Sequence, residues 1–143
     1  MRTLVVIALL SLMLWNCSGT SSAVAPTRES AAVAKDTLRI ANDELEYEII
    51  IIDPGFTSWL NSVARQRGYY DQSFLESRNQ LWVMEYNLRV NQPYRYSPNL
   101  YILAIDYQRG IDYGYEVNYL LYNYLVYFQL THKQNLGNFA ARP

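Results

Sequence analysis

The sequence predicts a small single domain of the α+β class, with about three helices and one or two short strands. Segment 46–53, EYEIIIID, is a β-branched run of strand length that ends at an Asp-Pro-Gly turn. Later apolar residues recur at helical spacing, above all in the tyrosine-rich stretch 113–133, which we expect to be the long last helix. A mainly α domain is the alternative, because the evidence for a strand rests on one segment.

The strand is expected over residues 46–52, with Tyr47, Ile49 and Ile51 on one face. A single strand leaves the hydrogen-bonding groups of its backbone unsatisfied. We therefore expect either residues 100–103 or a second chain to pair with it.

The first helix is expected to begin just after Pro54 and to end near Gly68. Its apolar residues fall at positions i, i+3, i+4 and i+7, the spacing of one helical face: Phe56, Trp59, Leu60 and Val63.

The second helix is expected from Ser73 to about Asn91. Ser73 and Glu76 have the spacing of a capping box, in which each side chain accepts a hydrogen bond from the backbone of the other. The alternation of apolar residues within 82–90 also fits a strand, but the cap favours a helix.

The third helix, 113–133, has an apolar arc and an opposite arc rich in tyrosine. The first arc is formed by Val117, Leu120, Leu121, Tyr124 and Phe128, and the second by Tyr115, Tyr119, Tyr122 and Val126. Polar residues such as Asn118 and Asn123 lie between the arcs, which disfavours a membrane crossing. We expect this helix to contact protein on two sides.

Composition argues against several classes of protein. The chain has 143 residues and is 50% hydrophobic, which suits one modest globular domain. Its 12 basic and 13 acidic residues give no positive field that would attract nucleic acid. It has one histidine, one cysteine and no glycine-rich phosphate loop. We expect no metal, no cofactor and no nucleic-acid partner.

The amino terminus resembles the signal of a bacterial lipoprotein. Residues 4–15 form an apolar run that is too short for the roughly 20 residues that cross a bilayer. The run leads into Leu14-Trp15-Asn16-Cys17, which is similar to the lipobox, where an aliphatic residue stands three positions before an acylated cysteine. Trp15 and Asn16 are bulkier than is usual there. We expect Cys17 to carry a lipid anchor that holds the chain on a membrane.

Ordinary secretory cleavage after Ala25 is the alternative, and it would give a secreted or soluble periplasmic protein. Pro26 directly after the cut disfavours it. The segment after Cys17 is rich in serine, alanine and threonine and has no periodicity, which is typical of a flexible spacer. The expected divisions are a signal peptide over 1–16, the acylated cysteine and tether over 17–41, the globular domain over 42–138 and a tail over 139–143.

We expect a binding protein more than an enzyme, with an envelope protein as partner. The candidate contacts are the tyrosine arc, with Tyr115, Tyr119 and Tyr122, and the loop 92–114, with Arg95, Asp106, Arg109 and Asp112. Arginine stacks on aromatic rings and grips carboxylates, so a glycan-binding module is the alternative. A hydrolase is the third hypothesis, because carboxylates are available in and near this loop, but their spacing selects no pair among Glu85, Asp106, Asp112 and Glu116.

Four phrases carry a family resemblance: NDELEYEIIIIDPGF at 42–56, RGYY at 67–70, FLESRN at 74–79 and IDYGYEVNYLLYNYLVYF at 111–128. They resemble a family of short lipoproteins of unknown function from Bacteroidetes-type Gram-negative bacteria. The resemblance implies a location in the cell envelope and supplies no catalytic residues. The segment after Cys17, SGTSS, lacks the acidic run of surface-exported lipoproteins in such bacteria. We therefore expect an outer-membrane lipoprotein that faces the periplasm.

Replacing Cys17 with Ser is expected to move the protein from the membrane fraction to the soluble fraction. Each methylene of an acyl chain contributes about 0.8 kcal/mol to membrane binding, and a mature lipoprotein carries more than one chain. Envelope fractionation with a carbonate or high-salt wash measures this, and Ser21→Ala is the control that stays membrane-bound. A Cys17→Ser protein that remained on washed membranes would show that Cys17 is not the anchor.

Overall fold

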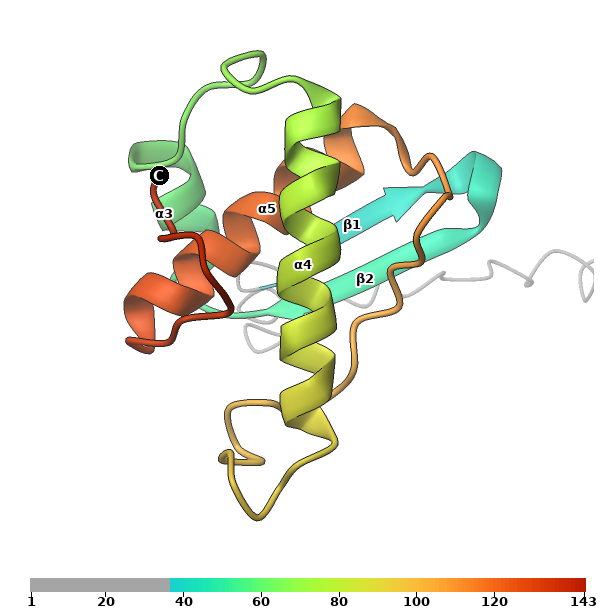
Figure 1. The fold of residues 1–143 in the computed structure, drawn as a ribbon. Helices are drawn as coiled ribbons and strands as arrows, with labels where there is room; N and C mark the ends of the chain where they lie inside the picture. Colours follow the sequence, from blue (N-terminus) through green and yellow to red (C-terminus); the bar gives the residue numbers. More distant parts are fainter. Residues whose placement is uncertain (1–36) are drawn as a thin grey trace, which may run out of the picture.

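The computed structural model describes residues 37–143, which form an α+β domain (Figure 1). The elements in chain order are β1 (Thr37–Asn42), the 3-10 turn η1 (Asp43–Leu45), β2 (Tyr47–Ile52), α3 (Phe56–Ser62), α4 (Gln72–Val90) and α5 (Gly114–Thr131). The predicted fold class is therefore confirmed. Cys17, the signal peptide and most of the expected tether lie outside the described residues.

The two strands form an antiparallel hairpin in which Thr37 pairs with Ile52 and Asn42 with Tyr47. Asn42 shapes the turn, because its side-chain oxygen accepts hydrogen bonds from the backbone N–H groups of Glu44 and Leu45 at 3.0 and 3.2 Å. Glu46 closes the turn in the left-handed region, at φ 51°. The strand partner of β2 is thus β1, and residues 100–103 do not pair with it.

Strand β1 also corrects the expected domain boundary, because residues 37–41 belong to the sheet and not to the tether. The physical reason is that the backbone groups of β2 need partners, and the segment directly before the turn supplies them. Ile40 is fully buried and Ile51 nearly so, whereas Ile50 and Ile52 lie on the outer face of the sheet. The expected alternation along β2 is therefore observed.

Helix α3 is shorter than predicted. It ends at Ser62, well before Gly68, and Val63 at its end is exposed. Only Phe56 of the predicted apolar stripe is fully buried, while Trp59 and Leu60 are partly buried and pack against the core.

Helix α4 is confirmed, including the part that also fitted a strand, but its cap differs from the prediction. The N-cap is Asp71, whose carboxylate accepts a hydrogen bond from the Phe74 N–H at 2.7 Å and another from the Ser73 hydroxyl at 2.9 Å. Ser73 already lies inside the helix, so it forms no capping box with Glu76. Aspartate is as good a cap as serine, and the one that stands directly before the helix takes the role.

Helix α5 lies between α4 and the two strands (Figure 1) and also contacts α3. Both of its predicted arcs are buried except at Tyr115 and Tyr124, which are partly buried, and three polar residues between the arcs are buried too. All three donate hydrogen bonds to the carbonyl oxygens one turn earlier: Asn118 to Gly114 O at 2.8 Å, Asn123 to Tyr119 O at 2.8 Å and Gln129 to Leu125 O at 3.0 Å. None of the helices within residues 37–143 is long and apolar enough to cross a membrane.

We expect Gly55→Ala to lower the free energy of unfolding by about 1–3 kcal/mol, because it overpacks the core. A methyl group at this position would overlap the hydroxyl of Tyr127, which is fixed by a hydrogen bond of 2.9 Å to Asp53. Chemical unfolding measures the change. In a Tyr127→Phe background the penalty should shrink, because the clashing oxygen is gone. An equal penalty in both backgrounds would contradict this explanation.

Candidate binding surfaces

The predicted tyrosine arc of α5 is covered by other parts of the chain. Tyr119 is 5% exposed and Tyr122 is 4% exposed. The hydroxyl of Tyr119 donates to the carbonyl of Arg65 at 2.7 Å, and that of Tyr122 to the carbonyl of Arg142 at 3.3 Å. These two tyrosines hold the segment before α4 and the carboxyl-terminal residues against α5, so they leave a partner almost no surface.

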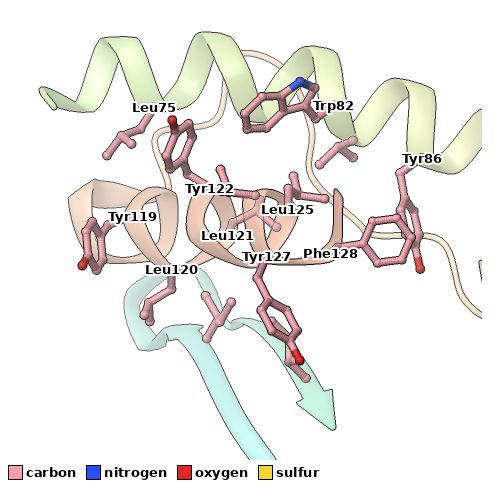
Figure 2. Close-up of a cluster of buried hydrophobic side chains, with 14 of the residues drawn as sticks. Leu75, Trp82, Tyr86, Tyr119, Leu120, Leu121, Tyr122, Leu125, Tyr127 and Phe128 are labelled. Atoms are coloured by element: carbon pink, nitrogen blue, oxygen red, sulfur yellow. The ribbon is translucent and has the colours of Figure 1, made fainter. Parts of the chain in front are cut away.

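Tyr122 also packs against α4. Its ring lies 5.3 Å from that of Trp82, and Figure 2 shows it between the two helices. Tyr115 is partly buried, and its hydroxyl accepts a hydrogen bond from the Gly68 N–H at 2.6 Å. The arc predicted as a contact surface is therefore internal packing, because irregular segments on both sides close over it.

The charged residues of the loop 92–114 do not form one site. Arg95 is exposed and stacks on Tyr96 at 5.4 Å, and Arg109 is also exposed. Asp112 accepts hydrogen bonds from the side chain of Gln72 at 2.6 Å and from the Gly114 N–H at 2.9 Å, which fixes the start of α5. Asp106 is exposed and is bonded only to the side chain of Gln108 among the described residues, at 3.3 Å.

The carboxylates considered for a hydrolase are divided among different interactions. Glu85 pairs with Arg89 at 2.7 Å, and Glu116 pairs with Arg67. The other two are the loop acids, of which Asp112 is used structurally. Within residues 37–143 there is also no group of three metal-ligating side chains. This arrangement gives no support to paired-carboxylate chemistry.

A groove of about 580 Å³ lies between β2 and the segment 100–106. Four exposed aliphatic side chains line it, with exposed fractions of 58–75%: Ile50, Ile52, Ile102 and Leu103. Strand β2 is hydrogen-bonded to β1 alone in this sheet, so its other edge is open along the groove. Open strand edges with apolar flanks are the places where a further strand adds to a sheet.

The far wall of the groove is held in place by side chains of α4. Asn87 forms two hydrogen bonds of 2.8 Å with the backbone of Ile105, one to its N–H and one to its carbonyl. Arg89 donates to the Tyr101 hydroxyl at 2.8 Å. Segment 102–107 is thus held in place although it belongs to no strand, because the side chain of Asn87 supplies hydrogen bonds to its backbone.

One end of the groove is acidic. Glu48 of β2 and Asp106 of the facing segment both line it, and the adjoining turn adds Asp43 and Glu44. The nearby Arg39 is shared between Glu48 at 2.7 Å and Asp43 at 3.0 Å. Acidic groups therefore outnumber basic ones at this end, whereas the other end is apolar.

The sequence predicts a contact in the loop 92–114, but not this groove. A signal was available in the run Ile49–Ile52, which makes both faces of β2 apolar. A strand that is apolar on both faces usually contacts protein on both of them. Because residues 100–103 were expected to pair with the free edge of β2, the apolar outer face of this strand did not indicate a binding site.

These features define a small α+β domain that has an open sheet edge and, beside it, a groove whose far wall is held by side-chain hydrogen bonds. The chain belongs to the Family of unknown function (DUF6146), whose model matches residues 4–142. A comparison with curated proteins finds no match, and neither does a comparison with solved structures. The expected membership of a family of unknown function is thereby confirmed.

The buried tyrosines predict that the protein loses stability in alkali. Burial, and then the nearby Glu76 carboxylate, raise the pKa of Tyr107 from 10.0 to about 12. Burial likewise raises the pKa values of Tyr47, Tyr86 and Tyr122. The hydroxyl groups of these tyrosines therefore stay protonated to a higher pH in the folded state than in the unfolded state. The contribution of these protonated tyrosines to the stability of the folded state is fully present below pH 10. It is lost as the pH rises from 10 towards 12 and above.

Thermal unfolding followed at increasing pH, together with the ultraviolet absorbance of tyrosinate, measures this loss. Tyr107→Phe should make the melting temperature less sensitive to pH in this window. Tyr94→Phe is the control and should leave the sensitivity unchanged, because Tyr94 is fully exposed. Ionisation of every tyrosine near pH 10 in a protein that stays folded would contradict the prediction.

Proposed function

We propose that this protein is a non-enzymatic lipoprotein of the bacterial cell envelope that binds another envelope protein. The pattern of residues 4–17 supports an anchor at Cys17, and the SGTSS segment favours the periplasmic face of the outer membrane. No bound cofactor or catalytic group is needed for this role. The protein would act by holding a partner near the membrane.

The groove between β2 and segment 100–106 is the observation that carries the proposal. Its open strand edge offers backbone hydrogen bonds, and its exposed aliphatic side chains offer apolar contact. Contiguous exposed apolar surface beside an unpaired edge is a liability that soluble proteins normally cover. A partner that covers it would relieve that liability.

The chemistry of the groove selects an extended segment of the partner as its occupant. Such a segment would pair with the free edge of β2 and place alternate apolar side chains against Ile50, Ile102 and Leu103. The acidic end, with Glu48 and Asp106, would be complemented by a lysine or arginine of the partner. The proposed partner therefore contributes an apolar strand with a basic residue at one end.

The test is cross-linking in native envelopes with two matched variants, Leu103→Ser in the groove and Met84→Ser on the exposed side of α4. These side chains are 75% and 65% exposed, so each change should alter the free energy of unfolding by no more than about 0.5 kcal/mol. If Leu103 is a main contact, Leu103→Ser should reduce the captured partner at least about fivefold. Met84→Ser should not change it.

The identity of the captured segment completes the test. A synthetic peptide of the cross-linked region should compete with capture, and replacing its basic residue should weaken the competition. Equal capture by both variants would overturn the groove as the binding site. Cross-links only to a second copy of this chain would overturn the proposal of a different envelope protein as partner.

A further inference from the structure

A second cleft, of about 470 Å³, is bounded by α4, α5 and residues near the carboxyl terminus. Its walls combine aromatic rings with two arginines and contain no acidic residue: Tyr70, Phe74, Arg78, Trp82, Tyr122, Asn138, Phe139, Ala140 and Arg142. Its volume falls in the range of about 300–1,000 Å³ that is usual for small-molecule sites. The cleft is therefore both large enough and positively charged.

Arg78 is the central residue of this cleft. Its guanidinium carbon lies 5.0 Å from the ring centre of Phe74 and 3.6 Å from that of Phe139. Stacking on rings uses the flat faces of a guanidinium and leaves the N–H donors at its edge. In the part of the chain that the structure describes, no carboxylate pairs with Arg78 and no acceptor takes a hydrogen bond from it.

Of the four other arginines that stack on rings within residues 37–143, two also pair with a carboxylate, which Arg78 does not. Arg67 lies over the ring of Tyr119 at 4.5 Å and pairs with Glu116. Arg89 lies over Tyr96 at 4.9 Å and pairs with Glu85. Each of these guanidinium groups has both a ring for its face and a carboxylate for its edge. Arg78 has the rings alone, and it is partly buried in a cleft.

The remaining walls indicate the kind of molecule that would supply the anion. Arg142 gives a second positive charge and Asn138 an amide, while Tyr70, Phe74 and Phe139, whose rings are not fully buried, offer apolar surface. Trp82 also lines the cleft, and its buried indole N–H has no hydrogen-bond partner among the described residues. Aromatic walls suit a ring that stacks, and a guanidinium edge suits an oxyanion bound by two hydrogen bonds.

We propose that this cleft binds a small ring-shaped ligand that carries a carboxylate or a phosphate, such as an acidic sugar. The oxyanion accepts hydrogen bonds from the edge of Arg78, with Arg142 as the second cation. The ring of the ligand packs against the aromatic walls. This site is separate from the groove beside β2, so either can fail without the other.

Isothermal titration of the full-length chain in detergent tests the proposal with four probes: galacturonic acid, galactose 1-phosphate, galactose and inorganic phosphate. At least one of the two charged sugars should bind at least about tenfold more tightly than galactose and than inorganic phosphate. Binding of only one charged sugar supports the proposal and identifies the anion. No binding of either, or equal binding of galactose or of phosphate alone, would overturn it.

Variants assign the binding to Arg78. Arg78→Gln should lower the affinity by roughly 10- to 100-fold, the loss expected for charged hydrogen bonds. Arg78→Lys should also weaken it, because lysine keeps the charge and loses the planar fork. Arg95→Gln is the matched control, an exposed arginine stacked on one ring, and should leave the affinity unchanged.

A purely structural role for Arg78 makes a different prediction. It would only hold Phe139 and the carboxyl-terminal residues, so Arg78→Gln would lower the melting temperature while no probe bound the unaltered protein. If Arg78→Gln fails to fold, Arg142→Gln replaces it, because Arg142 is exposed. Unchanged affinity for the charged sugar in Arg142→Gln and in Arg78→Lys would overturn the assignment of the site.

Discussion

The burial of α5 on every side is the constraint on which the rest of this fold depends. Most residues of the helix are buried, and they include amides and tyrosine hydroxyls as well as aliphatic side chains. Two helices and a two-stranded sheet do not cover such a surface completely. The chain therefore covers α5 with irregular segments, and the tyrosine hydroxyls reach out from the core to bind the carbonyl groups of those segments. The same tyrosine side chains therefore pack their rings in the core and donate hydrogen bonds to backbone carbonyl groups.

A buried polar cluster connects α5 to α4 in a similar way. Asn79 and Asn118 are both fully buried, and the amide of Asn79 donates to the Asn118 carbonyl at 3.0 Å. Tyr107, from the loop before α5, adds a hydrogen bond of 2.6 Å to the Asn118 side chain. Because buried amides need partners at defined positions, this cluster fixes how the two helices and the loop align. Apolar packing alone would permit several alignments.

The long helices and the core face of β2 were predictable because each has a periodic signal. Strand β1 was not, since only Leu38 and Ile40 mark its core face and the segment before it resembles a spacer. The tyrosine arc of α5 was predicted from its spacing, but its burial was not. Whether Tyr119 and Tyr122 face solvent depends on residues near 65 and 142, which lie in segments without periodicity. Periodicity identifies the faces of an element and says nothing about what covers them.

The same limit explains why neither candidate site was predicted as a whole from the sequence, although the apolar run 49–52 marked one wall of the groove. Each lies where an irregular segment meets a regular element: residues 100–106 beside β2, and residues 138–142 beside α4. Helix α4 contributes to both, with Tyr86 at the groove and Arg78 at the cleft. Because a close-packed helix is rigid, α4 holds the two sites at a fixed distance from each other. The core that hides the tyrosines therefore also gives the domain two independent surfaces, one apolar and acidic, the other aromatic and basic.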